Sequence, residues 1–235
     1  MTDTLDPSTT PADRPDPNDR ADGPDRPSHA GGADRRERRR RWTALVAVAV
    51  VLPALGWFGW QWLTPHPYSG TVMQAPTSAP DMDGLVWGDG TPVELADLGG
   101  RLVLVYFGYT ACPDVCPTTM SGVVQALDEL GDEADDVAVM MVSIDPDRDS
   151  PAIVERYVQS FHPRFRGASG DIADVERVAT LYGIFFARDE PTVDGEYTMS
   201  HTSTLLGIDP DGHLRIVWPT VLDPGRLAAD IRELL

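Results

Sequence analysis

The feature that most limits how this chain can fold is a stretch without any charge, from Thr43 to Trp60. Six of the seven residues just before it, 35–41, are arginines. An apolar helix of this length crosses most of the hydrocarbon core of a bilayer. Basic flanks stay on the cytoplasmic side. We therefore predict a transmembrane helix over residues 42–63, with its N-terminus inside. A cleaved signal peptide is the alternative, but no clear small-x-small cleavage site follows Leu63.

The segments on either side of this helix lack residues that build a core. Residues 1–41 are mostly Pro, Asp, Arg, Gly and Ala, and they predict a disordered cytoplasmic tail. Residues 64–82 are rich in Pro and Ser and predict a linker. Residues 83–235 have the length of one domain. The chain beyond the helix carries the whole net charge of −18. That charge argues against nucleic-acid binding, because phosphate contacts need cations.

The domain alternates between strand and helix signals. Leu102–Gly108 and Val137–Ile144 are almost continuously apolar, as strands buried on both faces are. A parallel βαβ unit followed by a hairpin and a last helix is typical of thioredoxin-like folds. The predicted fold class is therefore α/β, a thioredoxin-like central mixed sheet flanked by helices, with an N-terminal transmembrane helix. We expect helices over 118–130, 151–160, 171–182 and 223–235, and hairpin strands over 203–208 and 213–218.

Two cysteines, Cys112 and Cys116, lie where the first buried strand turns into a helix, and the chain has no others. Their spacing puts both sulfurs on one helix face, where they can close a disulfide or bind a soft metal ion. A bridge over three residues would restrain little of the unfolded chain, so the spacing favours chemistry over stabilisation. The helix N-terminus predicts that both thiols are more acidic than a free cysteine.

Two thiolates alone leave a metal short of ligands, so a third ligand is expected. Among five histidines, His201 lies just before the predicted hairpin, in the loop that faces the dithiol in thioredoxin-like folds. His162 precedes Pro163 in a loop, as an exposed residue can, and His213 begins the second strand of the predicted hairpin. Thioredoxins usually carry a cis-proline in this loop, whereas no proline occurs here between Pro191 and Pro210. The exchange of proline for histidine favours metal binding over disulfide exchange.

Two acidic segments are more simply interpreted as a loop and a turn than as metal sites. Residues 145–149, Asp-Pro-Asp-Arg-Asp, resemble the start of a calcium-binding loop. Ser150 and Arg156, however, occupy positions where that loop needs Gly and Glu. We expect a loop that caps the next helix, near the dithiol end of the sheet, where a partner protein can dock. Residues 209–212, Asp-Pro-Asp-Gly, predict a turn.

Three segments together resemble the Sco/SenC family. They are residues 107–120 (Phe-Gly-Tyr-Thr-Ala-Cys-Pro-Asp-Val-Cys-Pro-Thr-Thr-Met), residues 143–151 around the Asp-Pro-Asp-Arg-Asp run, and residues 197–212, which contain His201. They occur in the family's order and spacing, and the resemblance extends over about residues 75–235.

The resemblance implies a thioredoxin-like domain that binds a copper ion through Cys112, Cys116 and His201. It also implies a copper chaperone that helps to assemble the binuclear copper centre of cytochrome c oxidase subunit II. Such a protein lies on the outer face of a bacterial cytoplasmic membrane, with a periplasmic copper donor or thiol reductant as a further partner. Asp114 and Asp145 match family positions and are secondary candidates for tuning the site or contacting a partner.

Other activities remain open at this point. Some family members act as thiol–disulfide reductants, so an oxidoreductase that uses Cys112 and Cys116 is the second interpretation. A thiol peroxidase is a third, but no Arg or Lys occurs between Arg101 and Arg148 to activate a thiol. Two departures from the family, Ala111 before the first cysteine and Ser200 before the histidine, remove no ligand but alter its surroundings.

Overall fold

The computed structural model describes residues 31–63, 67–219 and 223–235. Most of the predicted disordered tail, residues 1–30, lies outside this part of the chain. Its last residues belong to a helix, because α1 extends over Gly31–Leu63. Arginine and glutamate are good helix formers, and Arg41 pairs with Glu37 one turn away at 2.9 Å.

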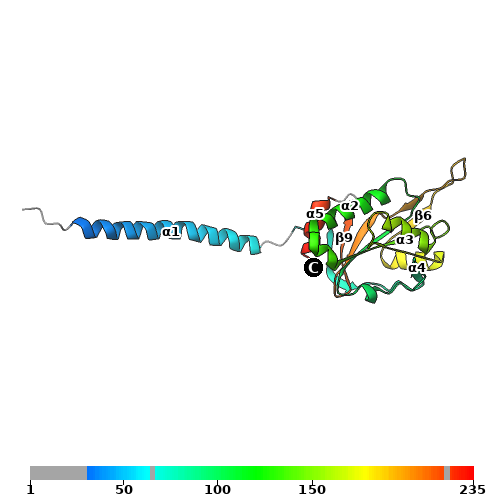
Figure 1. Cartoon of the computed structure of the whole chain (residues 1–235), viewed down its shortest axis with the longest axis horizontal. Helices are drawn as coiled ribbons and strands as arrows, with labels where there is room; N and C mark the ends of the chain where they lie inside the picture. Colours follow the sequence, from blue (N-terminus) through cyan, green and yellow to red (C-terminus); the bar gives the residue numbers. More distant parts are fainter. Residues whose placement is uncertain (1–30, 64–66, 220–222) are drawn as a thin grey trace, which may run out of the picture. The chain divides into compact units, whose positions relative to one another are not determined.

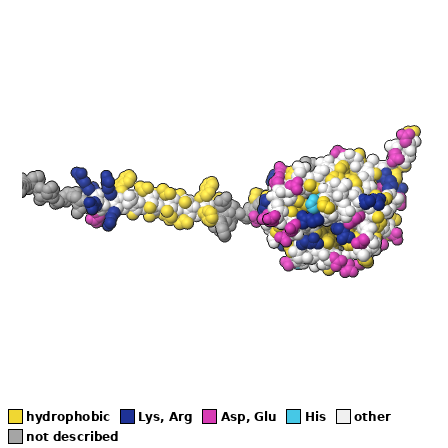
Figure 2. Space-filling view, viewed as in Figure 1, with side chains coloured by type: hydrophobic (Ala, Val, Ile, Leu, Met, Phe, Trp, Pro, Cys, Tyr) yellow, Lys and Arg dark blue, Asp and Glu magenta, His cyan; other side chains and the backbone are white. Residues whose placement is uncertain are grey.

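Helix α1 contains a segment, Arg35–Trp60, that is long and apolar enough to cross a membrane. Its large apolar side chains, such as Trp42, Trp57 and Trp60, are exposed. Figure 2 shows these apolar side chains along α1, with basic side chains gathered at its N-terminal end. The chain divides into two compact units, Met1–Thr64 and Pro65–Leu235.

A seven-stranded mixed sheet forms the centre of the second unit, in the order β1-β9-β8-β3-β4-β5-β2 (Figure 1). Strands β3, β4 and β5 are parallel to one another, and the other pairs are antiparallel. This architecture is the thioredoxin-like mixed sheet that the sequence predicts. The strands are β1 Thr71–Ser78, β2 Leu85–Trp87, β3 Leu102–Gly108, β4 Val137–Ser143, β5 Arg166–Gly170, β8 Thr204–Ile208 and β9 His213–Pro219.

Four helices follow the predicted order: α2 Val115–Leu130, α3 Pro151–Gln159, α4 Ile172–Leu181 and α5 Pro224–Arg232. Helix α2 begins at Val115, three residues before the predicted start at residue 118. Pro117 fits in its first turn, because the backbone N–H groups there have no partner within the helix. The Asp223 side chain caps α5 as expected, accepting a hydrogen bond from the Arg226 amide at 3.0 Å.

Part of the predicted linker belongs to the sheet. Within residues 64–82, Thr71–Ser78 forms β1, which pairs antiparallel with β9 at the edge. The proline content that suggested a linker is compatible with an edge strand, where one side of the backbone has no partner strand. The register also shifts between Val72 and Thr77, around Pro76.

Four short strands were not predicted, because they are too short to show a hydrophobic period: β2, β5, β6 (Phe186–Arg188) and β7 (Met199–His201). Strand β5 is also unusually rich in small residues, because α3 packs against it. A Cβ atom on Gly167 would lie 2.5 Å from the backbone carbon of Val154 in α3. Strands β6 and β7 form a separate two-stranded sheet.

Strand β3 directs its side chains alternately to the two faces of the central sheet. The Tyr106 hydroxyl reaches Cys116 in α2, whereas the Phe107 ring lies 5.7 Å from that of Tyr182, just after α4. Helix α2 in turn contacts α5. The loop that follows β3 and carries Cys112 therefore lies on the face of the sheet that α2 covers.

Candidate metal centre

The two cysteines lie at the junction between β3 and α2. Cys112 is in the connecting loop, where its amide donates to the Tyr109 carbonyl at 3.3 Å, and Cys116 is in the first turn of α2. Both are free thiols, with 8% and 0% of their surface exposed. The Cys116 amide donates to the Cys112 sulfur at 3.3 Å. The Cys116 amide, at the start of α2, thus holds the Cys112 sulfur close to Cys116.

His201 approaches the cysteines from the other side. It ends β7, and its Nε2 atom lies 3.9 Å from the Cys116 Sγ atom. The other ring nitrogen, Nδ1, lies 3.2 Å from the Thr202 carbonyl. A carbonyl only accepts hydrogen bonds, so this contact requires a proton on Nδ1 and leaves the Nε2 lone pair directed toward the sulfur.

Aromatic rings and burial keep the imidazole neutral and fixed. The rings of Tyr106 and Tyr109 meet it edge-on, at 6.3 and 6.1 Å between centroids. Burial lowers the pKa of His201 below its usual range, and the hydrogen bond to Thr202 opposes part of that shift. A neutral imidazole with an unprotonated Nε2 is the form that binds metals.

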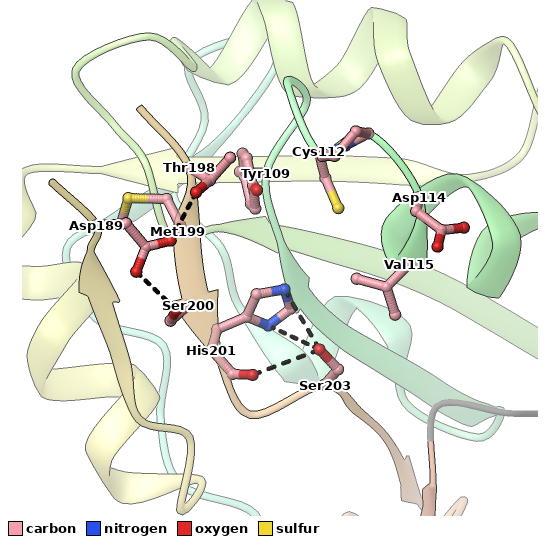
Figure 3. Close-up of a pocket in the computed structure, with 11 residues that line it drawn as sticks. Tyr109, Cys112, Asp114, Val115, Asp189, Thr198, Met199, Ser200, His201 and Ser203 are labelled. Carbon is pink, nitrogen blue, oxygen red and sulfur yellow. Dashed lines mark hydrogen bonds between the residues drawn. The ribbon is translucent and has the colours of Figure 1, made fainter. Parts of the chain in front are cut away.

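An open cavity of about 460 Å³ lies between the cysteine loop and the histidine strand. Figure 3 shows the Cys112 sulfur and the His201 ring on opposite sides of it. Asp114 and Asp189 line it as well and bring negative charge to its walls. The cavity gives a small ligand or a partner's side chain access to Cys112 and His201.

Cys116 does not have the acidity that its position at a helix start predicts. Burial, the largest cause, raises the pKa of its thiol to about 12. The expectation of an acidic thiol is therefore wrong for this residue, because loss of water outweighs the helix dipole. A metal ion would have to displace the thiol proton, and its positive charge favours that exchange.

Two residues shape the space around the Cys116 sulfur. The Tyr106 hydroxyl lies 3.5 Å from it, within hydrogen-bonding range for sulfur. A Cβ atom on Gly108 would lie 3.0 Å from the same sulfur and 2.6 Å from the Tyr106 ring, so only glycine fits there. Tyr106 was not among the predicted site residues. The alternation of side chains in β3 could have indicated it, because Tyr106 and Gly108 lie on the same face of the strand.

The secondary candidates, Asp114 and Asp145, have different surroundings. Asp114 is exposed before α2, and its carboxylate accepts a hydrogen bond from the Thr118 hydroxyl at 3.3 Å. Asp145 is 1% exposed and does not line the cavity. It accepts a hydrogen bond from the Tyr197 hydroxyl at 2.8 Å. Asp145 therefore contacts the chain that leads to His201 instead of the cavity itself.

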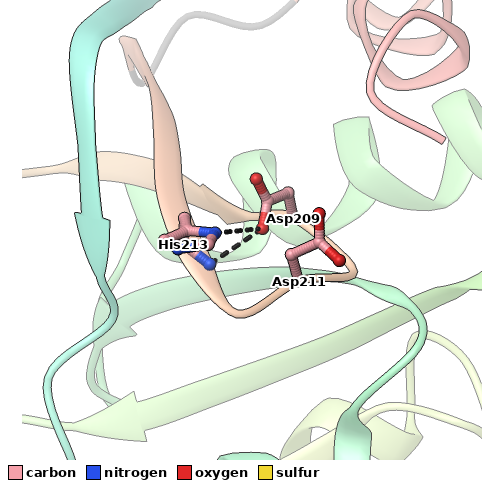
Figure 4. A group of neighbouring side chains, drawn as sticks. All are labelled: Asp209, Asp211 and His213. Atoms are coloured by element: carbon pink, nitrogen blue, oxygen red, sulfur yellow. Dashed lines mark hydrogen bonds and ion pairs between the residues drawn. The ribbon is translucent and has the colours of Figure 1, made fainter.

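Among the described residues of the second unit, the two other histidines, His162 and His213, do not approach the cysteine site. The His162 ring packs on Phe165, with 5.1 Å between centroids. His213 lies beside Asp209 and Asp211, with side-chain ligand atoms within 4.8 Å of one another (Figure 4). The Asp209 carboxylate accepts a hydrogen bond from the His213 amide at 2.8 Å. This group closes the turn of the β8–β9 hairpin, as the sequence predicts for residues 209–212.

The donor set fits a soft metal ion. Two thiol sulfurs and one imidazole nitrogen are the ligands that copper(I) prefers, and His201 Nε2 is directed toward Cys116. The fold and the site thus define a thioredoxin-like domain with a dithiol and a facing histidine.

Comparison with known proteins agrees with this class. The model of the SCO1/SenC family matches residues 84–235, and the chain belongs to that family. It is 33% identical to the human mitochondrial protein SCO1 homolog over 137 residues, which are 57% of this chain and 46% of the relative. It is 34% identical to a SCO2-like protein of Rickettsia felis over 117 residues, or 49% of this chain and 57% of the relative. The chain spans about half the length of the curated relatives it matches.

Solved structures support the same assignment. Apo Sco1 from Thermus thermophilus superposes with a TM-score of 0.64 at 33% identity, covering 72% of this chain and 98% of that one. ScoI from Bradyrhizobium japonicum, solved with copper bound, has a TM-score of 0.58 at 37% identity, covering 68% of this chain and 98% of that one. A relative with this fold therefore holds copper.

Proposed function

We propose that this protein is a membrane-anchored copper chaperone. In this proposal it holds one copper ion through Cys112, Cys116 and His201 and helps to assemble the binuclear copper centre of cytochrome c oxidase subunit II. The observation that carries the proposal is the 3.9 Å separation between His201 Nε2 and Cys116 Sγ, with Nδ1 engaged by a carbonyl. Copper supplies no reaction here, because it is the cargo.

The chain's own groups would bind and release that cargo. The neutral imidazole needs no deprotonation, whereas each thiol loses its proton as copper binds. Cys112 and His201 line the cavity, so an incoming donor or a recipient can exchange ligands with them. Cys116 is fully buried and would hold the ion until the transfer is complete.

The domain arrangement belongs to the same proposal. Residues 1–41 would remain in the cytoplasm, residues 42–63 would cross the cytoplasmic membrane, and the domain would lie outside. The arginines before the apolar segment support this orientation. A reporter that works only outside the membrane, fused after Leu235, should be active. Activity of a cytoplasmic reporter at that position would contradict both the orientation and the role.

A thiol–disulfide oxidoreductase that reduces the cysteines of the copper site in subunit II is the second candidate. The contact of 3.3 Å between the Cys116 amide and the Cys112 sulfur favours it, because it keeps the two cysteines near each other. Oxidation would join the two sulfurs and remove both thiolates, so a disulfide and a bound copper ion would exclude one another.

Oxidase assembly in cells separates the two candidates. Copper delivery needs His201, whereas dithiol reduction needs only the cysteines. Cells with His201→Ala should fail to assemble the copper centre, as should cells with both cysteines replaced. His162→Ala, with expression checked, is the control and should assemble normally. Normal assembly with His201→Ala beside failure of the double cysteine variant would replace delivery by reduction.

A further inference from the structure

The loop of residues 145–149 connects β4 to α3, and its three carboxylates do not converge on one point. Asp145 and Asp149 are 1% and 0% exposed, whereas the Asp147 side chain is 65% exposed. Buried carboxylates need partners to offset their lost hydration. Each of the two finds its partners in a different segment of the copper site, so the partners indicate what the loop does.

Asp149 holds the cysteine loop. It accepts hydrogen bonds from the Thr110 amide at 2.8 Å and from the Thr110 hydroxyl at 2.5 Å. The Ser143 hydroxyl, at the end of β4, donates to the same carboxylate at 2.7 Å. Thr110 precedes Cys112 by two residues. The buried carboxylate therefore ties the backbone that carries the first sulfur to the central sheet.

Asp145 and its neighbour Arg148 hold the chain that leads to His201. Asp145 accepts hydrogen bonds from the Tyr197 hydroxyl, at 2.8 Å, and from Arg148. Arg148 also donates to the Tyr197 carbonyl at 3.0 Å. The Tyr197 ring lies 3.7 Å from the Arg148 guanidinium carbon and 4.2 Å from that of Arg188 in β6. Arg188 pairs in turn with Asp147.

The strand that carries His201 needs such support. Strands β6 and β7 form a two-stranded sheet outside the main one, and an isolated two-stranded hairpin is marginally stable in water. A ligand side chain must be held within about 0.5 Å of its working position. The stacking of two guanidinium groups on one ring and the buried hydrogen bonds supply that restraint.

We propose that the 145–149 loop is the positioning element that sets the separation between the His201 imidazole and the cysteine thiols. It acts through Tyr197 on the histidine side and through Thr110 on the cysteine side. In its relation to copper this role rests on the proposed function. The loop itself touches no copper ligand, so Asp145, Arg148 and Asp149 are positioning residues.

The test uses the full-length, reduced protein in detergent. Tyr197→Leu removes the stacked ring and its hydroxyl, and Tyr197→Phe removes only the hydroxyl. Tyr182→Phe is the matched control, because its hydroxyl bonds to the Pro80 carbonyl, away from the 145–149 loop, at 2.7 Å. Two quantities are measured: amide hydrogen exchange of residues 199–201 without metal, and copper(I) affinity in competition with a chromophoric chelator.

Exchange at residues 199–201 should become faster with Tyr197→Leu, less so with Tyr197→Phe, and not at all with Tyr182→Phe. Copper affinity should fall about tenfold with Tyr197→Leu, as is usual when the support of a ligand is lost. In the His201→Ala background the same substitution should change affinity less than about twofold, because the effect passes through the imidazole.

Thr110→Val provides the opposite pattern. It acts through the cysteine side, so its loss of affinity should persist in the His201→Ala background. Equal losses from Tyr197→Leu in both backgrounds, or unchanged exchange at residues 199–201, would overturn the proposal. A wild-type protein that binds no copper would instead overturn the proposed function, and the exchange data would still decide whether the loop positions β7.

Discussion

The two halves of the candidate copper site are built in different ways. The cysteines belong to the junction of β3 and α2, where Cys116 and the strand residues beneath it are fully buried. His201 ends a three-residue strand in a separate two-stranded sheet and is only partly buried. The Cys116 thiol is thus fixed by the hydrophobic core and the Cys112 loop by the buried Asp149 carboxylate, whereas the His201 imidazole depends on polar and stacking contacts at the periphery. Replacing Cys116 should therefore lower copper(I) affinity more than replacing His201.

The largest effect is expected from Cys116→Ser. It exchanges a soft sulfur for a hard oxygen at the most enclosed ligand, so copper(I) affinity should fall by more than about 100-fold, beyond the range for second-sphere residues. Competition with a chromophoric chelator measures the change, and Ser160→Ala on the surface is the control. An affinity within a few-fold of wild type would show that Cys116 is not a ligand.

His201→Ala should have the next largest effect. Two thiolates remain in place, so we expect a loss of roughly 10- to 100-fold in copper(I) affinity, smaller than that of Cys116→Ser. The same titration, run on His162→Ala and His213→Ala, provides matched controls that should bind like wild type. Equal losses of copper(I) affinity from all three substitutions would contradict the distinction between a cysteine half of the site in the core and a histidine half at the periphery.

The pH dependence of Cys116 alkylation should show how far burial raises the pKa of its thiol. In a Cys112→Ser background, alkylation of Cys116 should accelerate about tenfold per pH unit from pH 7 to 9, because a pKa of about 12 lies well above this range. Adding Tyr106→Phe should slow the reaction, since its hydroxyl lowers the pKa of that thiol. Mass spectrometry gives the rates. A plateau near pH 8 would mean that the thiol is acidic after all.

The smallest effect concerns the stability of the metal-free protein. Because burial lowers the pKa of His201, the unfolded chain binds more protons than the folded one below the ordinary pKa of 6.5. The free energy of unfolding should therefore fall as the pH drops below about 6.5. His201→Gln should lose less stability than wild type between pH 7 and 5.5, measured by chemical denaturation. A parallel decline in the two proteins would contradict the assigned shift.

The same contrast explains what the sequence could predict. The strands β3 and β4 carry continuous apolar runs, and Asp223 with Pro224 marks the start of α5, so local signals sufficed there. Strands β6 and β7 have three residues each and no period to detect. Strand β1 contains Pro76, and its proline suggested a linker. Its pairing with β9 has no local signal, because the partner residues lie far along the chain. Sequence patterns thus identified the core half and left the peripheral half incomplete.

The candidate site followed a similar division. The spacing of the cysteines and the resemblance to a family indicated Cys112, Cys116 and His201, which the structure brings together. The raised pKa of Cys116 could not be predicted, since it depends on how completely the fold excludes water. The contacts of Asp145 with Tyr197 also escaped detection, because residues 52 positions apart meet only in the folded chain.

X-ray absorption of the full-length, reduced protein loaded with one equivalent of copper(I) tests the central claim most directly. The account predicts two sulfur neighbours and one imidazole nitrogen around the copper ion, with the nitrogen contribution lost in His201→Ala and kept in His162→Ala. A copper environment without imidazole, or one that His201→Ala leaves unchanged, would contradict the account.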